Sequence, residues 1–168
     1  SKSTTTLLEG AEAFAGGETR TITIDGVNYT VKNKLSTAND LSYSKDASTG
    51  ELTLIASNFE IRGQEDVAHN IIISGRSNNV YGGKLNDTIK EAGNSVCSTN
   101  NIFAGDGDDT IVLYGGNSNA YGEAGDDILT GYGGNLYGGE GNDIWNINCN
   151  GCTHQGGSGN DIFNINSS

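Results

Sequence analysis

Five short segments in the second half of the chain share one pattern. Each has glycines among its first four residues, Asp at position 6 and an apolar residue at position 8. Their first residues lie 22, 18, 16 and 18 residues apart, so the mean repeat is close to two nine-residue units. This repeat constrains the fold more than composition does, because one such unit cannot bury its apolar residue without a neighbour stacked on it. The segments are GGKLNDTIK (82–90), AGDGDDTIV (104–112), GEAGDDILT (122–130), GGEGNDIWN (138–146) and GGSGNDIFN (156–164).

Less regular units alternate with these segments at 73–81, 95–103, 113–121, 131–137 and 147–155. Each repeat therefore predicts two short strands, with one inward apolar residue on each. The stacked repeats give an all-β fold, a parallel β-roll (β-solenoid) of about five 18-residue coils, with coils roughly 4.8 Å apart. The expected inward columns are Ile89, Ile111, Leu129, Trp145 and Phe163 on one side, and Val80, Ile102, Ala120, Leu136 and His154 on the other.

Over residues 73–168 the chain resembles the RTX (repeats-in-toxin) calcium-binding repeat, GGxGxDxUx. Segments 138–146 and 156–164 match this pattern in full, and 104–112 and 122–130 each have one glycine replaced. The resemblance implies a right-handed roll with Ca²⁺ held between stacked loops. It also implies a module of a larger secreted or cell-surface bacterial protein, exported by type I secretion and folded by calcium outside the cell.

The resemblance assigns the calcium ligands to the Asp at position 6 and to the backbone carbonyls of loop positions 1 to 4. Ca²⁺ takes roughly six to eight oxygen ligands, which two stacked loops can supply together. Five loops on one edge leave four gaps, and thus at most four ions. The expected ligand residues are Gly105, Gly107, Asp109, Gly122, Ala124, Gly125, Asp127, Gly138, Gly139, Glu140, Gly141, Asp143, Gly156, Gly157, Ser158, Gly159, Asp161 and Asp87.

The first loop and the opposite edge depart from the family pattern. Leu85 replaces a glycine in the first loop, and Lys84 would oppose a cation there. The turns of the less regular units contain no carboxylate at 115–118 or 133–135. We therefore expect calcium on one edge of the roll only, whereas many RTX rolls bind it on both.

The charge distribution favours metal ions as partners. Residues 82–168 hold eleven acids and two bases, a net charge of 2 − 11 = −9, and residues 1–81 have 7 − 10 = −3. Nucleic acids and anionic membranes are excluded as partners, because they require clustered Lys and Arg. No segment has the roughly 18 apolar residues of a membrane span. We expect the isolated module to be monomeric.

The N-terminal part lacks the glycine–aspartate pattern and predicts β-hairpins. Apolar residues alternate on both sides of Asp25-Gly26 over Thr19–Lys32, and again around 48–50 over 41–56. Leu7–Phe14 lies in a lead segment interpreted as flexible or as a short helix. We expect a hairpin cap at 1–56 and the RTX-like roll at 57–168. Because the sequence begins at Ser1, we also expect it to be part of a longer protein.

Cys149, Cys152 and His154 are the alternative site. A CxxC pair with a nearby His is compatible with a zinc half-site, a redox pair or a nucleophile with its base. It is also compatible with a structural role, including a local disulfide, with His154 partly buried in the stack. The only other histidine is His69, which suggests no catalytic triad, so we expect no enzyme in this module.

An aromatic column offers a further alternative, a module that binds glycan or protein or forms a surface layer. Tyr81, Phe103, Tyr121 and Tyr137 share one position in successive coils. Cross-strand stacking between the rings is the structural explanation of the same pattern. A neighbouring column of Asn79, Asn101, Asn119 and Asn135 is expected to form hydrogen bonds along the sheet.

Overall fold

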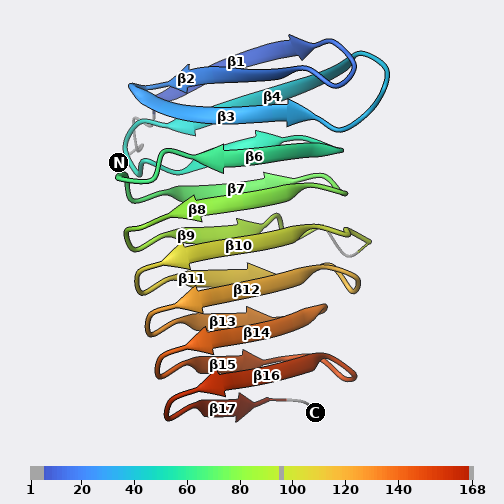
Figure 1. Cartoon of the computed structure of the whole chain (residues 1–168). Coiled ribbons are helices and arrows are strands. Elements are labelled where there is room, and N and C mark those ends of the chain that lie inside the picture. Colours follow the sequence, from blue (N-terminus) through green and yellow to red (C-terminus); the bar gives the residue numbers. More distant parts are fainter. Residues whose placement is uncertain (1–5, 95–96, 167–168) are drawn as a thin grey trace, which may run out of the picture.

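The computed structural model describes residues 6–94 and 97–166, and none of these residues is helical. The described residues form strands that run to and fro in two facing sheets (Figure 1). The strands are β1 (Leu7–Phe14), β2 (Thr19–Ile24), β3 (Val27–Asn33), β4 (Asn39–Asp46), β5 (Leu52–Ile55), β6 (Phe59–Gly63), β7 (Asn70–Ser74), β8 (Asn79–Gly83), β9 (Thr88–Glu91), β10 (Asn101–Asp106), β11 (Thr110–Leu113), β12 (Asn119–Ala124), β13 (Ile128–Gly131), β14 (Asn135–Glu140), β15 (Ile144–Ile147), β16 (Thr153–Ser158) and β17 (Ile162–Ile165).

From β5 onward the strands alternate between the two sheets, which confirms the predicted solenoid. The first sheet has the order β1-β4-β5-β7-β9-β11-β13-β15-β17, and the second has the order β16-β14-β12-β10-β8-β6-β3-β2. From β5 and β6 onward each strand pairs in parallel with the strand one coil later. The result is an all-β solenoid of about six turns, one more than the spacing predicted.

The core is a thin double column of apolar side chains between the sheets. In the first sheet Ile71, Ile89 and Ile111 follow one another in register, and Leu129 and Trp145 continue the column. All five are fully buried. The other sheet contributes a facing column, which includes Val80, Ile102, Ala120 and Leu136 at 0% exposure. Stacking therefore buries side chains that a single coil would leave in water.

The N-terminal strands close one end of the solenoid. Both predicted hairpins form, with β2 paired to β3 and β4 paired to β5, all antiparallel. The helical interpretation of Leu7–Phe14 is wrong, because this segment is strand β1, paired along its whole length with β4. Its less exposed residues recur at every second position and end at the buried Phe14, which is the period of a strand.

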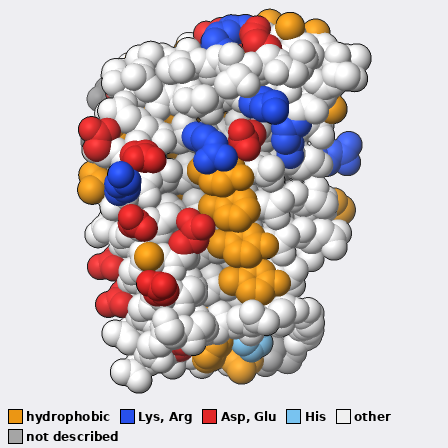
Figure 2. All heavy atoms as spheres, viewed as in Figure 1, with side chains coloured by type: hydrophobic (Ala, Val, Ile, Leu, Met, Phe, Trp, Pro, Cys, Tyr) orange, Lys and Arg blue, Asp and Glu red, His pale blue; other side chains and the backbone are white. Residues whose placement is uncertain are grey.

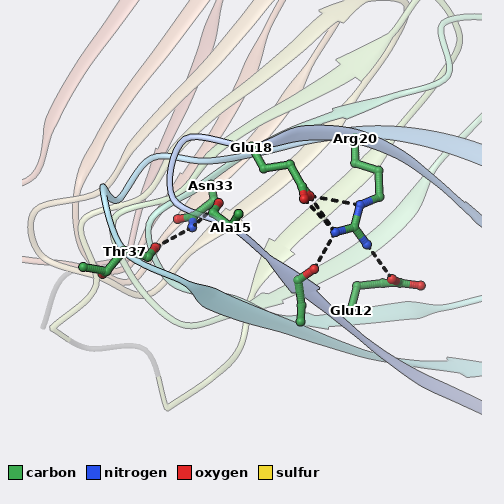
Figure 3. A network of polar contacts seen from close by, with 7 residues as sticks. Glu12, Ala15, Glu18, Arg20, Asn33 and Thr37 are labelled. Carbon is green, nitrogen blue, oxygen red and sulfur yellow. Dashed lines mark hydrogen bonds and ion pairs between the residues drawn. The ribbon is translucent and has the colours of Figure 1, made fainter.

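Arg20 ties the two sheets together at this closed end (Figure 3). Its guanidinium, on β2, forms ion pairs with Glu18 at 2.6 Å and with Glu12 on β1 at 3.0 Å. The same group lies 4.5 Å from the ring centroid of Phe14, which packs edge-on against Phe59. The cap thus buries its aromatic residues and places charge on the outside.

The last described coil differs from the cap because its inward side chains are exposed. Phe163 stacks on Trp145 with ring centroids 4.4 Å apart but remains 39% exposed. His154 takes the predicted inward column, in register with Leu136, yet it is exposed, and its ring lies 5.3 Å from that of Phe163 at a tilt of 48°. Its expected partial burial is wrong, because no described coil covers β16.

Candidate metal centre

Five loops that connect the second sheet to the first stack along one edge, which we call the acidic edge. They follow β8, β10, β12, β14 and β16, and they bring every predicted ligand residue to this edge. The position-6 Asp of each loop comes directly before, or one residue before, a strand of the first sheet. Their column consists of Asp87, Asp109, Asp127, Asp143 and Asp161.

The Asp side chains form a hydrogen-bonded ladder along the edge. The Oδ1 atom of each Asp accepts the backbone N–H of the equivalent residue one coil earlier. The N···O distances are 2.7 Å from Asp87 to Asp109, 2.8 Å from Asp109 to Asp127 and 2.8 Å from Asp127 to Asp143. One carboxylate oxygen per loop therefore has a structural role.

The second carboxylate oxygen is buried without a partner in the middle of the ladder. Oδ2 of Asp109, Asp127 and Asp143 receives no hydrogen bond, although these residues are at most 1% exposed. An unsatisfied buried acceptor costs about 1–3 kcal/mol, and more when it is charged. A cation, a proton or an ordered water molecule would satisfy these three oxygens. At Asp87, by contrast, Oδ2 accepts the N–H of Gly83 at 2.9 Å.

Position-1 glycines leave the space in which these Oδ2 atoms lie. A Cβ added at Gly122 would collide with Oδ2 of Asp127, and one at Gly138 would collide with Oδ2 of Asp143. Gly156 has the same relation to Asp161. Glycine at position 1 and Asp at position 6 are thus one steric pair, and Ala104 is the exception among the strong loops.

Position-4 carbonyls point across the gaps between loops. A Cβ at Gly125 would collide with the carbonyl oxygen of Gly107, and Gly141 has the same relation to the carbonyl of Gly125. Both glycines have positive φ, 130° and 127°, which an L-residue with a Cβ rarely adopts. A carbonyl also lies beside the carboxylate at position 1, because a Cβ at Gly122 would meet both Oδ2 of Asp127 and the carbonyl oxygen of Gly138.

Burial raises the pKa of the carboxyl groups in the middle of the ladder. The pKa of Asp109 rises to about 8 and that of Asp127 to about 7, with desolvation as the main cause and neighbouring carboxylates adding to it. The pKa of Asp143 is raised for the same reasons. Without a counter-charge Asp109 and Asp127 are at least partly protonated near neutral pH.

The donor set fits a hard cation that accepts backbone oxygens. Within residues 6–94 and 97–166, no three His, Cys, Asp or Glu side chains converge on one point. A cation here would take carboxylate oxygen from the Asp column and the remaining ligands from carbonyls. That is a calcium-type donor set rather than a zinc-type one.

Lys84, which is expected to oppose a cation at the first loop, has an acidic partner. Its ammonium forms an ion pair with Glu65 at 3.1 Å, on the preceding loop. That preceding loop places His69 in the Asp column, where its backbone N–H donates to Asp87 Oδ1 at 2.7 Å. The row of carboxylates therefore begins at Asp87 and does not extend into the cap.

The opposite edge, which we call the neutral edge, contains an analogous ladder without a column of carboxylates. The N–H of Asn78 donates to Oδ1 of Asn100 at 3.0 Å, and the N–H of Asn100 donates to Oγ of Ser118 at 3.0 Å. The Asn side chains also use their amide groups, since Nδ2 of Asn78 donates to the Ala56 carbonyl at 2.7 Å. This ladder was not predicted, although Asn78 and Asn100 precede the predicted Asn column by one residue.

Glu91 is the one buried carboxylate of the neutral edge, and protein donors satisfy it. It is 2% exposed. It accepts Nδ2 of Asn100 at 2.8 Å, Oγ of Ser118 at 2.7 Å and the backbone N–H groups of Tyr114 and Gly115 at 2.9 Å. The hydroxyl of Ser98 is a further donor. Sequence reasoning missed this residue, because Glu91 lies outside every repeat position with an assigned role.

Cys149 and Cys152 form a disulfide within the turn that follows β15. In this state neither residue has a thiol to offer as a metal ligand or a nucleophile. The third cysteine, Cys97, is exposed and unpaired. The local disulfide that was one of the structural interpretations of the CxxC pair is therefore present.

The aromatic column is a continuous stack on the outer face of the second sheet, visible as a stripe in Figure 2. Ring centroids of Tyr81, Phe103, Tyr121 and Tyr137 lie 4.8, 4.8 and 5.0 Å apart, with planes within 10° of parallel. The faces of the rings thus cover one another and leave mainly edges to solvent. The predicted Asn column beside it does form amide-to-amide hydrogen bonds of 2.8–3.0 Å.

Comparison of the chain with protein-family models, curated proteins and solved structures returned no match. Among the described residues there is no helix long and apolar enough to cross a membrane. The resemblance to RTX repeats therefore rests on the residues of the five segments themselves.

Proposed function

We propose that the chain is an RTX-like calcium-binding module that folds and stiffens when Ca²⁺ enters the gaps of the acidic edge. The observation that carries this proposal is a difference in hydrogen bonding between the side chains of the two edges. Oδ2 of Asp109, Asp127 and Asp143 has no partner, whereas the Asn ladder opposite is satisfied by protein groups. Bound calcium would supply positive charge to the buried carboxylates and connect neighbouring coils.

The chain's own residues supply three things to such a site. The Oδ1 ladder fixes the orientation of each carboxylate, so Oδ2 is held toward the position-1 glycine. The carbonyls of residues such as Gly107 and Gly125 add neutral oxygen across the gap. Five loops and four gaps give at most four ions, with the gaps between Asp109 and Asp161 preferred over the one at Asp87.

Two further observations support a location outside the cytosol. The Cys149–Cys152 disulfide is of a kind that persists in oxidising compartments. Residues 82–168 carry a net charge of −9, so calcium at extracellular concentrations would relieve their mutual repulsion. We propose a secreted or cell-surface parent protein for the module, with a binding and mechanical role rather than a catalytic one.

Terbium luminescence tests the proposal directly, because Tb³⁺ replaces Ca²⁺ and Trp145 is the only tryptophan. The Trp145 ring and Oδ2 of Asp143 both border Gly138. We expect sensitised emission on excitation of Trp145, displaced by Ca²⁺ and lost in a Trp145→Phe variant. Calorimetry with calcium and with chelator gives the second measurement. If calcium leaves the melting temperature unchanged and no terbium emission appears, the proposal fails.

A further inference from the structure

A groove runs along the outer face of the second sheet, beside the aromatic column. Its ridge is one row in register across the strands, from Thr21 and Thr30 through Arg62 to Tyr81 and the rings that follow. The neighbouring row lies two positions away along the strands and is glycine at four of its seven positions, so few side chains fill the floor. That row contains Asn28, Gln64, Gly83, Gly105, Glu123, Gly139 and Gly157.

The groove is deepest where it leaves the N-terminal cap. A hollow of about 410 Å³ lies over β2, β3, β6 and β8, and a second of about 220 Å³ continues it toward β10. The two share Arg62, Glu65, Tyr81 and Gly82 in their walls, so they form one continuous depression. This is the size range of a cleft for a small molecule or a short oligomer.

Hydrogen-bonding groups without excess charge line the larger hollow. Thr21, Thr30 and Asn28 present hydroxyl and amide groups that are exposed to solvent. The two charged residues are already neutralised, because Arg62 pairs with Glu60 at 3.4 Å and Glu65 pairs with Lys84 at 3.1 Å. The hollow therefore offers no net charge that would attract an ionic ligand.

One wall of the hollow is a flat, rigid surface. The guanidinium of Arg62 lies 3.8 Å from the centroid of the Tyr81 ring, which stacks in turn on Phe103. Arg62 therefore covers the end of the aromatic stack and presents its own planar group outward. A pre-organised guanidinium loses little side-chain entropy for each hydrogen bond that it donates to a ligand oxygen.

Glu123 marks the other end of the depression. It occupies the glycine row with a φ of 76°, a conformation that residues with a Cβ rarely adopt. Its side chain projects where Gly105 and Gly139 leave the floor open, and it lines the second hollow together with Asp106. These two carboxylates would repel an anionic polymer that extended along the groove.

We propose that this depression binds a short stretch of neutral oligosaccharide, running from the cap hairpin to Glu123. A neutral polyhydroxylated chain supplies both donors and acceptors, which matches the mixed hydroxyl, amide and paired-charge lining. The paired charges disfavour an ionic ligand, and the polar lining disfavours an apolar one. The aromatic rings support the wall, and their mutually covered faces are not the binding platform.

Calorimetric titration with neutral hexasaccharides of glucose, mannose, xylose and N-acetylglucosamine tests the proposal, with polygalacturonate as an anionic comparison. We expect saturable binding of at least one neutral hexasaccharide. Thr30→Trp fills the hollow and should weaken that binding about tenfold or more. Thr53→Trp is the matched control, because it places the same side chain on the outer face of the other sheet and should leave binding unchanged.

Three outcomes would overturn the proposal. These are no binding by any neutral hexasaccharide, tighter binding of polygalacturonate, or unchanged affinity in Thr30→Trp. Loss of binding in Tyr137→Ala with none in Thr30→Trp would also assign the site to the aromatic column instead. Trp145 fluorescence verifies that each variant is folded, and Thr21→Trp replaces Thr30→Trp if the latter is not. The titrations are made with calcium, so they stand apart from the calcium proposal.

Discussion

On both edges of the solenoid a side-chain oxygen accepts a backbone N–H of the preceding coil, but the two edges use different side chains. On the acidic edge, Asp127 Oδ1 accepts the N–H of Asp109; on the neutral edge, Asn100 Oδ1 accepts the N–H of Asn78. The Asn side chain then donates through its amide, whereas the Asp side chain retains an unpartnered oxygen. A polar ladder therefore explains why a side-chain acceptor is needed at the turn, and it does not explain why that acceptor is charged.

The largest effect is expected on the neutral edge. Glu91→Ala would leave several buried donors without an acceptor, among them Asn100 Nδ2 and the N–H groups of Tyr114 and Gly115. Breaking such a buried network should cost about 3–5 kcal/mol of unfolding free energy. Urea unfolding measures this loss, which should be equal with calcium and with chelator. A loss that depends on calcium would contradict the distinction between the edges.

The next comparison uses one position with two substitutions. Asp127→Ala removes both the ladder acceptor and the oxygen proposed for calcium, so we expect a loss of about 2–3 kcal/mol in calcium. Asp127→Asn keeps the acceptor and replaces the unpartnered oxygen by an amide. We expect this variant to be about 1 kcal/mol more stable than the wild type in chelator, yet to bind fewer ions. Thermal melts and terbium titrations measure both quantities, with Asn100→Ala as the control on the neutral edge.

The raised pKa values predict how stability depends on pH without calcium. In the folded chain Asp109 and Asp127 have pKa values of about 8 and about 7, against 3.8 for an ordinary Asp. Between these limits the folded state retains protons that the unfolded state has lost. The contribution of these two groups to stability in chelator is therefore full below about pH 3.8 and is lost as pH rises through 8.

Calcium should remove this dependence, because a bound cation favours the ionised carboxylate. Melting temperatures recorded from pH 5 to pH 8, with and without calcium, measure the difference. The stabilisation by calcium should grow with pH over the same window. A chelator-treated protein whose stability rises with pH would show that the buried carboxylates are not protonated in the folded state.

The smallest effect is expected at Glu123. Its φ of 76° strains a residue with a Cβ, and Glu123→Gly removes that strain at the cost of a more flexible unfolded chain. We expect a gain in stability of about 1 kcal/mol or less, measured by urea unfolding. A loss of stability would mean that the Glu123 side chain makes a contact that outweighs its backbone strain.

The repeat could be recognised in the sequence because its period equals the length of one coil of the fold. Apolar residues such as Ile111 and Leu129 recur at the spacing of a coil, so the sequence predicted the inward columns and the stack of Asp loops. Strand β1 could not be predicted from the sequence, because Leu7–Phe14 belongs to no repeat and forms a strand by pairing with β4. The burial of His154 was predicted wrongly, because burial in a solenoid depends on the next coil as well as on the column.

The residues of the five segments determined the solenoid, the edge that gathers the carboxylates and the steric pairing of glycine with Asp. Those features are local or periodic, so they can be predicted from the order of residues alone. Only the tertiary structure decided that Oδ1 is used by the preceding coil while Oδ2 is not. It alone placed Glu91 at the centre of five donors from several turns, and it alone paired Lys84 with Glu65. The contacts of Glu91 and Lys84 join residues whose spacing follows no repeat, because folding rather than sequence order makes them neighbours.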